Sequence, residues 1–291
     1  MNKIALITGA TSGIGQATAL KAAEAGFDVI ITGRRNDRLQ KLAESIRQKG
    51  ADVLPLTFDI RQSGEVETAI RNLGGKWRDI SVLVNNAGLA VGVAPIQEGV
   101  LDDWERMIDT NVKGLLYITR AVAPLMIARN TGHIVNLASI AGKEVYPGGN
   151  VYCATKHAVD ALSRAMRTDM LKHHIKVTNI APGMVETEFS IVRYKGDKEA
   201  ADKVYQGMTP LTNEDIAETI IFAITRPAHV CLNDIVIMPT AQANSRDVDR
   251  KKVSEKDAFF FCYAARLLSI FIFKTSLVFS IISFGKVILQ K

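Results

Sequence analysis

The sequence predicts an α/β protein in which a doubly wound, mostly parallel sheet of seven strands carries helices on both faces. Seven short apolar runs alternate with longer segments of helical periodicity along residues 1–245. The runs are apolar throughout rather than at every second position, which indicates strands buried on both faces. Parallel strands need long crossover connections, and the helical segments provide them. No cluster of Pro and Gly interrupts this part of the chain, so we expect a single domain over residues 1–250.

The elements follow from these apolar runs and from the segments between them. The predicted strands cover residues 3–8, 28–32, 52–58, 80–86, 132–139, 175–180 and 234–238. The clearest helical segments cover residues 16–25, 104–127 and 150–171. In an open sheet of this kind, ligands bind outside the carboxyl ends of the strands. We therefore expect the functional residues to follow strands.

Composition and charge limit the classes of partner. The net charge of the 291-residue chain is +6, but residues 252–291 hold six Lys or Arg against two acids, which leaves +2 for residues 1–251. No basic stripe interleaved with aromatic residues marks a nucleic-acid surface, so we expect no nucleic-acid partner. Cys153, Cys231 and Cys262 lack the spacing of a metal site or a disulfide framework, so we expect no metal and a reducing compartment.

The region after residue 250 differs from the rest of the chain. Residues 267–284 are rich in Phe, Ile, Leu and Ser and contain one charge, Lys274. A spanning helix needs about 20 apolar residues, and a central Lys costs about 2.5–3.5 kcal/mol. We interpret residues 251–291 as an extension with a candidate membrane-associated helix; a helix packed on a partner subunit and sequence foreign to the natural protein are the alternatives. No signal peptide precedes the first strand, so we expect a cytoplasmic protein, with or without this membrane contact.

A glycine-rich loop follows the first predicted strand and precedes an Ala-rich helical segment. Its glycines have the spacing G-x-x-x-G-x-G. Such a loop lets the backbone approach a pyrophosphate, whose charge is met by backbone N–H groups and by the positive end of the helix dipole. An ordinary glycine turn is the alternative for the loop alone. The expected cofactor contacts are Gly9, Thr11, Ser12, Gly13, Ile14 and Gly15.

The residues after the second strand indicate which dinucleotide binds. A site selective for NAD offers an acid to the ribose 2′-hydroxyl, and this chain has Gly33 at that position, followed by Arg34 and Arg35. Two guanidinium groups suit a 2′-phosphate, so we predict NADP. A solvated basic start of a helix is the alternative. Asp59 follows the third strand. It could accept a hydrogen bond from the adenine amino group, or it could be the N-cap of the next helix.

Four polar residues form a candidate catalytic group. Tyr152 and Lys156 lie four residues apart in a predicted helix, so they share one face. A nearby ammonium would lower the tyrosine pKa from about 10 and make Tyr152 a useful acid/base. Ser139, at the end of the fifth strand, could hold the reacting oxygen, and buried Asn111 could link Lys156 to solvent through water. Each has a purely structural alternative, and it is their order together with the glycine loop that favours catalysis.

These motifs resemble the short-chain dehydrogenase/reductase family over residues 1–245. The glycine loop, the segment from Asn85 to Gly88, and Pro182-Gly183 with Thr187 are similar to its cofactor motifs. The resemblance implies a Rossmann domain, transfer of hydride to or from a nicotinamide, Tyr152 as acid/base, and a homodimer or homotetramer. The further cofactor contacts that it implies are Ile60, Asn86, Ala87, Gly88, Tyr152, Lys156, Pro182, Gly183, Val185 and Thr187.

Residues 104–111 and 186–197 look like the NADP-dependent 3-hydroxy acid dehydrogenases within that family. This narrower resemblance implies oxidation of serine, allo-threonine or 3-hydroxyisobutyrate, or reduction of the matching 3-oxo acids and semialdehydes. We hypothesise that Ser139, Tyr152 and Arg193 contact the substrate and that Arg193 closes over its carboxylate; a surface Arg paired with Glu188 or Asp197 is the alternative. A general carbonyl or 3-oxoacyl thioester reductase and a catalytically silent NADP-binding sensor are the competing functions.

Overall fold

A parallel sheet of seven strands, in the order β3-β2-β1-β4-β5-β6-β7, forms the centre of the computed structural model, which describes residues 3–251. All six neighbouring strand pairs are parallel. The predicted fold class is therefore confirmed. The strands are β1 (Ile4–Ile7), β2 (Asp28–Gly33), β3 (Val53–Thr57), β4 (Ile80–Asn85), β5 (Gly132–Leu137), β6 (Ile175–Pro182) and β7 (Asp234–Ile237).

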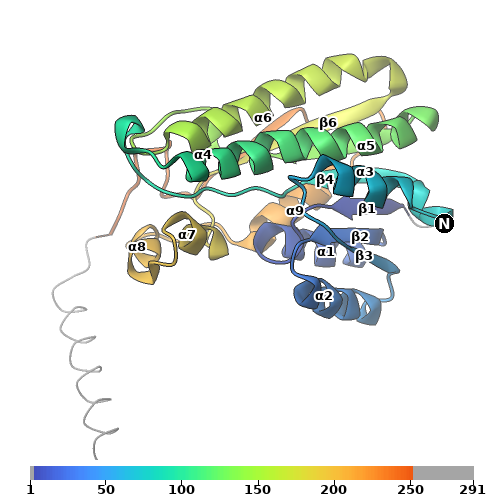
Figure 1. Cartoon of the computed structure of the whole chain (residues 1–291), viewed down its shortest axis with the longest axis horizontal. Helices are drawn as coiled ribbons and strands as arrows, with labels where there is room; N and C mark the ends of the chain where they lie inside the picture. Colours follow the sequence, from blue (N-terminus) through green and yellow to red (C-terminus); the bar gives the residue numbers. More distant parts are fainter. Residues whose placement is uncertain (1–2, 252–291) are drawn as a thin grey trace, which may run out of the picture. The chain divides into compact units, whose positions relative to one another are not determined.

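Helices cover both faces of the sheet (Figure 1). One face carries α1 (Gly13–Glu24), α2 (Asn36–Gln48) and α9 (Asn213–Ile224). The other carries α3 (Ser63–Arg71), α4 (Leu101–Ile108), α5 (Leu115–Ala128) and α6 (Asn150–Asp169). Two short helices, α7 (Glu188–Arg193) and α8 (Lys198–Lys203), lie away from both layers. Single turns occur at η1 (Gly75–Arg78), η2 (Ile96–Glu98), η3 (Asp109–Gly114), η4 (Ile140–Gly142) and η5 (Leu171–His173).

Strand β1 is apolar at every position because each of its faces meets a helical layer. In β1, Ile4 and Leu6 pack into the cluster with α3, α5 and α6, whereas Ala5 and Ile7 pack into the cluster with α1, α2 and α9. All four side chains are at most 2% exposed. The continuous apolar run of β1 therefore reflects burial of both of its faces, as predicted.

The helical run predicted over residues 104–127 differs from the prediction. The helix begins earlier, at Leu101, and one turn of π-helix, η3, separates α4 from α5. This turn contains Asn111, whose side chain bonds to neighbouring segments. A π-turn shifts the helix by one residue and commonly occurs at functional sites. Residue periodicity cannot reveal it, because the apolar spacing on either side stays helical.

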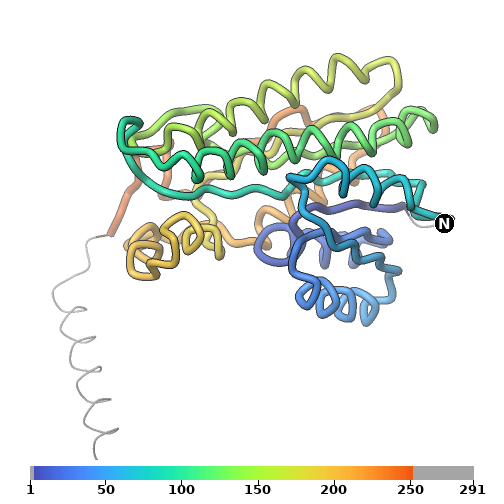
Figure 2. Tube along the Cα trace, viewed as in Figure 1, coloured from blue at the N-terminus to red at the C-terminus, as the bar shows by residue number. Residues whose placement is uncertain are grey.

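The order of the strands creates the binding edge. Beginning at β1, the chain adds strands first toward β3 and then, from β4, on the other side. The segments after β1 and β4 therefore lie side by side at the carboxyl edge, which is where dinucleotides bind in such sheets. After β6 the chain leaves the sheet and forms α7 and α8 before it returns through α9 to β7 (Figure 2).

The chain divides into two units, Met1–Asp249 and Arg250–Lys291. The apolar segment 267–284 lies outside the described residues. Within residues 3–251 no helix has both the length and the apolar character needed to cross a membrane.

Candidate active site

The loop between β1 and α1 has the geometry that a pyrophosphate requires. Gly9 and Gly13 have φ values of +66° and +57°, which favour glycine. A methyl group on Gly15 would lie 2.5 Å from the Gly9 carbonyl oxygen, so the loop closes tightly. Ser12 is the N-cap of α1 but makes no side-chain capping bond. The Ser12 side chain therefore accepts no hydrogen bond from the first N–H groups of α1. The glycine loop and these N–H groups fit a bound dinucleotide.

The residues after β4 hold this loop in place. Thr8 Oγ1 accepts from the backbone N–H groups of Asn86 and Ala87, both at 3.0 Å. The Asn86 amide donates to the carbonyl oxygens of Thr8 at 2.8 Å and Gly9 at 3.2 Å. Asn86 and Ala87 were predicted as cofactor contacts, and the structure gives them this bracing function as well.

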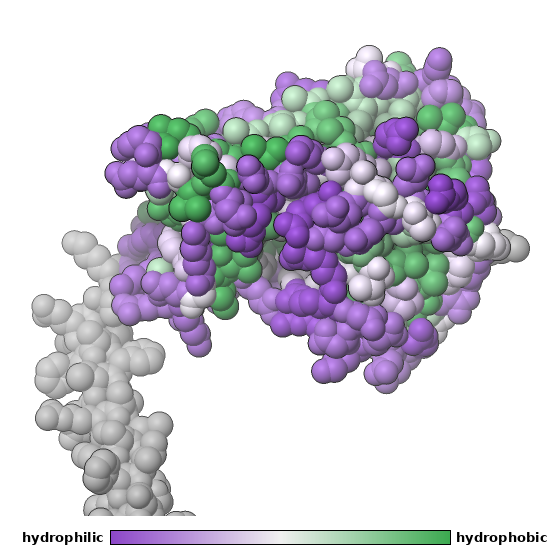
Figure 3. All heavy atoms as spheres, viewed as in Figure 1, coloured by the Kyte–Doolittle hydropathy of each residue, from purple (hydrophilic) through white to green (hydrophobic). Residues whose placement is uncertain are grey.

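The residues after β2 form a cluster of positive charge next to the glycine loop. A side chain on Gly33 would begin 2.6 Å from Thr11 Cγ2, so an acid at this position would require Thr11 to shift. Arg35 donates to the hydroxyl groups of Thr11 at 2.8 Å and Ser12 at 2.9 Å. Arg34 is 62% exposed, and hydrophilic side chains cover the neighbouring surface of α2 (Figure 3). The contact of these two guanidinium groups with a 2′-phosphate stays a prediction.

Asp59 and Ile60 lie at the end of β3 in different surroundings. The Asp59 carboxylate binds the Arg61 guanidinium at 2.6 Å, whereas the N-cap of α3 is Gln62. The N-cap alternative for Asp59 is therefore wrong, because α3 begins later than the sequence indicates. Ile60 is buried and packs against Gly114 of η3. Their contacts with the cofactor stay predictions.

Tyr152 and Lys156 lie on one face of α6, and both are buried. Lys156 Nζ lies 5.9 Å from the centre of the Tyr152 ring and donates to the Leu137 carbonyl oxygen at 2.7 Å. Burial lowers the pKa of Lys156 to about 8. The predicted helix and shared face are confirmed by this geometry.

The expected lowering of the tyrosine pKa is wrong for this structure. Burial raises the pKa of Tyr152 above its ordinary value, with a further contribution from Tyr146, and the Ser139 hydroxyl and Arg193 act in the opposite direction. The physical reason is that burial removes the water that would solvate a phenolate. The Lys156 ammonium, held by Leu137, does not offset this cost. Tyr152 is therefore a protonated phenol at neutral pH.

Ser139 and Asn111 complete the candidate catalytic group. Ser139 lies two residues after β5, accepts from the Ala141 N–H at 3.1 Å and donates to the Pro182 carbonyl oxygen at 3.4 Å. The Asn111 amide exchanges two 2.8 Å bonds with the backbone of Leu89. A methyl group on Gly88 would lie 3.3 Å from Asn111 Oδ1 and 3.5 Å from Lys156 Nζ. Asn111 and Lys156 thus border the same small space, as a water link between them requires.

The segment after β6 crosses toward the glycine loop. Thr187 is the N-cap of α7, accepts from the Phe189 N–H at 3.0 Å, and lies 3.7 Å from the position of a side chain on Gly13. Gln242 accepts from the Met184 N–H at 2.8 Å next to Gly183, and the Val185 carbonyl oxygen accepts from the Tyr205 hydroxyl. Of these residues, Thr187 lies beside the glycine loop. The contacts of Pro182, Gly183, Val185 and Thr187 with the cofactor stay predictions.

Arg193, at the end of α7, lies close to Tyr152. Its guanidinium lies 5.8 Å from the centre of the Tyr152 ring and 5.3 Å from that of Tyr146. It donates to the Tyr146 hydroxyl at 3.1 Å. Its Nε is buried without a hydrogen-bond partner, and no acid among residues 3–251 forms an ion pair with it. The predicted alternative of a surface pair is wrong, because Glu188 binds other arginines and Asp197 caps α8.

Several residues of the site were not expected from the sequence. Tyr146 holds Arg193, Thr155 accepts from the Asn111 amide at 3.0 Å, and Arg38 binds Glu188. Thr155 could have been found, because it lies between Tyr152 and Lys156 on the same helix; Tyr146 and Arg38 carry no local signal.

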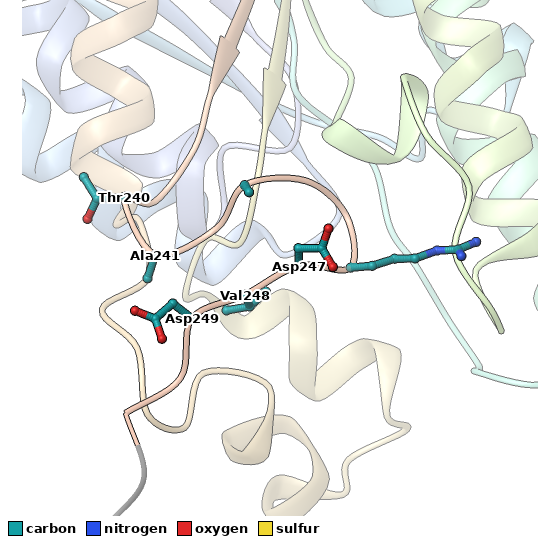
Figure 4. A pocket seen from close by; sticks show the side chains of 7 residues that line it. Thr240, Ala241, Asp247, Val248 and Asp249 are labelled. Atoms are coloured by element: carbon teal, nitrogen blue, oxygen red, sulfur yellow. The ribbon is translucent and has the colours of Figure 1, made fainter.

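An open pocket in the loop after β7 contains none of the candidate catalytic residues. It is lined by Thr240, Ala241, Ala243, Arg246, Asp247, Val248 and Asp249 (Figure 4).

Replacing Lys156 by Met should change how stability depends on pH. Between about pH 8 and pH 10.5 the buried lysine is neutral in the folded protein but protonated in the unfolded chain. The unfolded state then binds more protons, so the stability of the wild type rises with pH in this window. We expect the free energy of unfolding of Lys156→Met relative to wild type to fall by about 1.4 kcal/mol per pH unit there. Urea titrations of the cofactor-free proteins measure it, and a constant difference would contradict burial of the ammonium.

Comparison with known proteins shows the family of this chain. The family model described as short chain dehydrogenase matches residues 3–198. The chain belongs to the short-chain dehydrogenase family. Members of this family are oxidoreductases, and the resemblance drawn from the sequence motifs is confirmed.

Individual members of the short-chain dehydrogenase family give a closer comparison. NADP-dependent 3-hydroxy acid dehydrogenase YdfG from Salmonella typhi is 49% identical over 241 residues, which cover 82% of this chain and 96% of that protein. Sulfoacetaldehyde reductase 2 from Chromohalobacter salexigens is 47% identical over 244 residues, 84% of this chain and 96% of that protein. The closed form of serine dehydrogenase complexed with NADP+ has a TM-score of 0.81 and 44% identity, and covers 86% of this chain and 100% of that chain. The prediction of NADP as cofactor agrees with these relatives.

Proposed function

We propose that this enzyme uses NADP to oxidise the hydroxyl group of small 3-hydroxy acids such as serine, allo-threonine and 3-hydroxyisobutyrate, or NADPH to reduce the matching 3-oxo acids and semialdehydes. The observation that carries this proposal is the position of Arg193. Its guanidinium lies 5.8 Å from the ring of Tyr152, has a buried Nε without a partner, and forms no ion pair with an acid of residues 3–251.

A partly buried cation without an acidic partner favours an anionic ligand. A guanidinium that loses water needs an anion or acceptors in exchange. Arg193 has one acceptor, the Tyr146 hydroxyl, so donors remain for a carboxylate. Because the guanidinium and the phenol of Tyr152 border the same space, they fit a molecule whose carboxylate and hydroxyl group are a few bonds apart. A 3-hydroxy acid has this arrangement.

The cofactor would lie along the glycine loop, with its 2′-phosphate at Arg34 and Arg35. When bound, NADP supplies the oxidant at its nicotinamide ring. Two further predicted contacts are Thr187, which lies beside Gly13 of the glycine loop, and Pro182, whose carbonyl oxygen accepts from the Ser139 hydroxyl.

Tyr152 and Ser139 act on the reacting oxygen. The Ser139 hydroxyl holds this oxygen, and in reduction the Tyr152 hydroxyl donates a proton to it. In oxidation Tyr152 first loses its own proton, and its phenolate then accepts the proton of the substrate hydroxyl. Because the raised pKa keeps Tyr152 protonated at neutral pH, the tyrosine is ready to act as an acid in reduction. Lys156 and Asn111 border the space through which a proton reaches Tyr152 from solvent.

A sulfonate is a second candidate for the anionic group. A relative at 47% identity is named sulfoacetaldehyde reductase, and a guanidinium binds a sulfonate through the same charge-assisted bonds as a carboxylate. In this case the enzyme would reduce a small sulfonated aldehyde with the same tyrosine.

The test follows formation of NADPH from NADP, or of NADH from NAD. The substrates are serine, allo-threonine, 3-hydroxyisobutyrate, isethionate and 2-propanol, each offered in turn. We expect NADP-linked turnover of the three hydroxy acids and at least a hundredfold lower kcat/KM for 2-propanol, because two charged hydrogen bonds are lost. Turnover of isethionate alone would support the sulfonate candidate. Turnover only of acyl thioesters in the reverse direction would replace the proposal by thioester reduction, and NADP binding without any turnover would favour the sensor.

A further inference from the structure

The acid that begins α7 occupies part of the cluster of positive charge at the end of β2. Glu188 accepts from Arg38 Nη1 at 2.9 and 3.0 Å and from Arg35 Nη1 at 3.4 Å. Glu188 lies 150 residues from Arg38 in the sequence, so the fold alone brings them together. A carboxylate is an unfavourable neighbour for a phosphate, and its presence at this position needs a reason.

All three nitrogen atoms of the Arg35 guanidinium donate in this arrangement. Its Nε and Nη2 donate to Thr11 Oγ1 at 3.2 and 2.8 Å, and Nη2 also donates to Ser12 Oγ at 2.9 Å. Its Nη1 donates to Glu188. A 2′-phosphate bound here, as the proposed function requires, would compete with Glu188 for Arg35 Nη1.

The charges of the two anions oppose each other. A phosphate monoester carries roughly two negative charges near neutral pH. The arginines, chiefly Arg38, hold the pKa of Glu188 below its usual value, so its carboxylate is ionised. Two anions that share one guanidinium pair repel each other at short range. Because the side chains of Glu188, Arg35 and Arg38 are 49%, 42% and 41% exposed, solvent reduces this repulsion without removing it.

Glu188 also connects this cluster to the substrate side of the site. It is the first residue of α7, and Arg193 is the last. The far end of α7 has its own contacts: the Arg193 carbonyl oxygen accepts from the Gly92 N–H at 2.9 Å, and Lys195 pairs with Asp103 at 2.7 Å. The helix is thus fixed at one end by Arg35 and Arg38 and at the other by Gly92 and by Asp103 of α4.

We propose that Glu188 is a positioning residue that competes with the 2′-phosphate of the cofactor for Arg35 and Arg38, so that binding of the phosphate releases the first turn of α7. The competition lowers the affinity for NADP and leaves the affinity for NAD unchanged, so it reduces the preference for NADP. It also makes the mobility of the helix that carries Arg193 depend on which cofactor is bound. This inference rests on the placement of the 2′-phosphate at Arg34 and Arg35 in the proposed function.

Calorimetric titration with two probes that lack the nicotinamide tests the competition. The probes are 2′,5′-ADP, which carries the 2′-phosphate, and 5′-AMP, which does not. Replacing Glu188 by Gln should tighten binding of 2′,5′-ADP by about three- to tenfold, as expected for partly exposed ion pairs, and should leave the Kd of 5′-AMP unchanged. The gain should shrink at high salt. Glu199→Gln, on α8, removes an exposed acid that pairs only with Lys203 and should change neither Kd.

Two further outcomes separate this inference from the proposed function. Arg35→Met should weaken the binding of 2′,5′-ADP and leave the Kd of 5′-AMP unchanged. If both probes bind as they do to the wild type, the placement of the 2′-phosphate is wrong. If Arg35→Met behaves as expected but Glu188→Gln leaves the Kd of 2′,5′-ADP unchanged or weakens it, the competition is wrong and the placement stands.

Hydrogen exchange of residues 187–197 provides the structural measurement. Binding of 2′,5′-ADP to the wild type should speed exchange in this segment, whereas 5′-AMP should not. In Glu188→Gln the exchange should be fast before any probe is added. Slower exchange on binding of 2′,5′-ADP would mean that Glu188 clamps the phosphate instead of competing with it, and would overturn the proposal.

Discussion

Replacing Tyr152 by Phe should lower kcat/KM for every hydroxy acid by about 10²- to 10⁴-fold, the contribution of a positioned acid/base group. The change removes one oxygen atom. The ring keeps its contact with Phe189, whose ring centre lies 5.7 Å away, so the variant should fold. The Kd of NADP, measured by calorimetry, should stay within about threefold of the wild type, because the oxygen adds at most one hydrogen bond to the cofactor.

Tyr146→Phe is the matched control for this experiment. Tyr146 presents a second phenol to the same space, but its hydroxyl binds the Arg193 guanidinium. We expect this variant to raise KM and to keep a kcat near that of the wild type. Equal losses of kcat in the two variants, or more than a tenth of wild-type kcat in Tyr152→Phe, would refute Tyr152 as the proton donor.

Replacing Arg193 by Met should raise KM for serine and 3-hydroxyisobutyrate by about a hundredfold, because charged hydrogen bonds to the carboxylate are each worth about 1.5–3 kcal/mol. The kcat/KM for 2-propanol, which has no anion, should change by less than about threefold. Steady-state kinetics with both substrates gives the ratio that decides the question. Arg193→Lys should recover only part of the affinity, since an ammonium cannot bind both oxygens in the planar geometry of a guanidinium.

Arg226→Met controls for the loss of a guanidinium over an aromatic ring. Arg226 lies 4.2 Å above the ring of Phe222 in α9 and has no contact with the catalytic group. The Arg226→Met variant should leave kcat/KM for serine and for 2-propanol unchanged. A parallel loss of activity toward serine and 2-propanol in Arg193→Met would show that Arg193 holds α7 in place and does not bind the carboxylate.

Much of the site could be predicted because it rests on local chemistry. The glycine spacing from Gly9 to Gly15 is readable because tight turns demand residues without side chains. Tyr152 and Lys156 share a face because the helix has a fixed period. Gly33 followed by two arginines indicated NADP from charge alone, and relatives named for NADP agree.

Other predictions failed where burial or an interruption of regular structure decided the outcome. The pKa of Tyr152 rises because α6 packs the phenol away from water, and the degree of burial is not written in the spacing of two residues. The run predicted over residues 104–127 contains a π-turn at Asn111, because bonds to Leu89 and Thr155 stabilise that side chain. The homotetramer and the membrane contact through residues 267–284 stay predictions.

The sequence by itself determined the parallel sheet, the glycine loop, the spacing of the catalytic group and the family, because periodicity and the chemistry of single residue types act over a few residues. Only the tertiary structure decided that Arg193 meets Tyr146, 47 residues away, and that Glu188 meets Arg38, 150 residues away. These contacts depend on how α7 returns to the edge of the sheet. That path is set by the packing of the whole domain, since no local preference links residues so far apart.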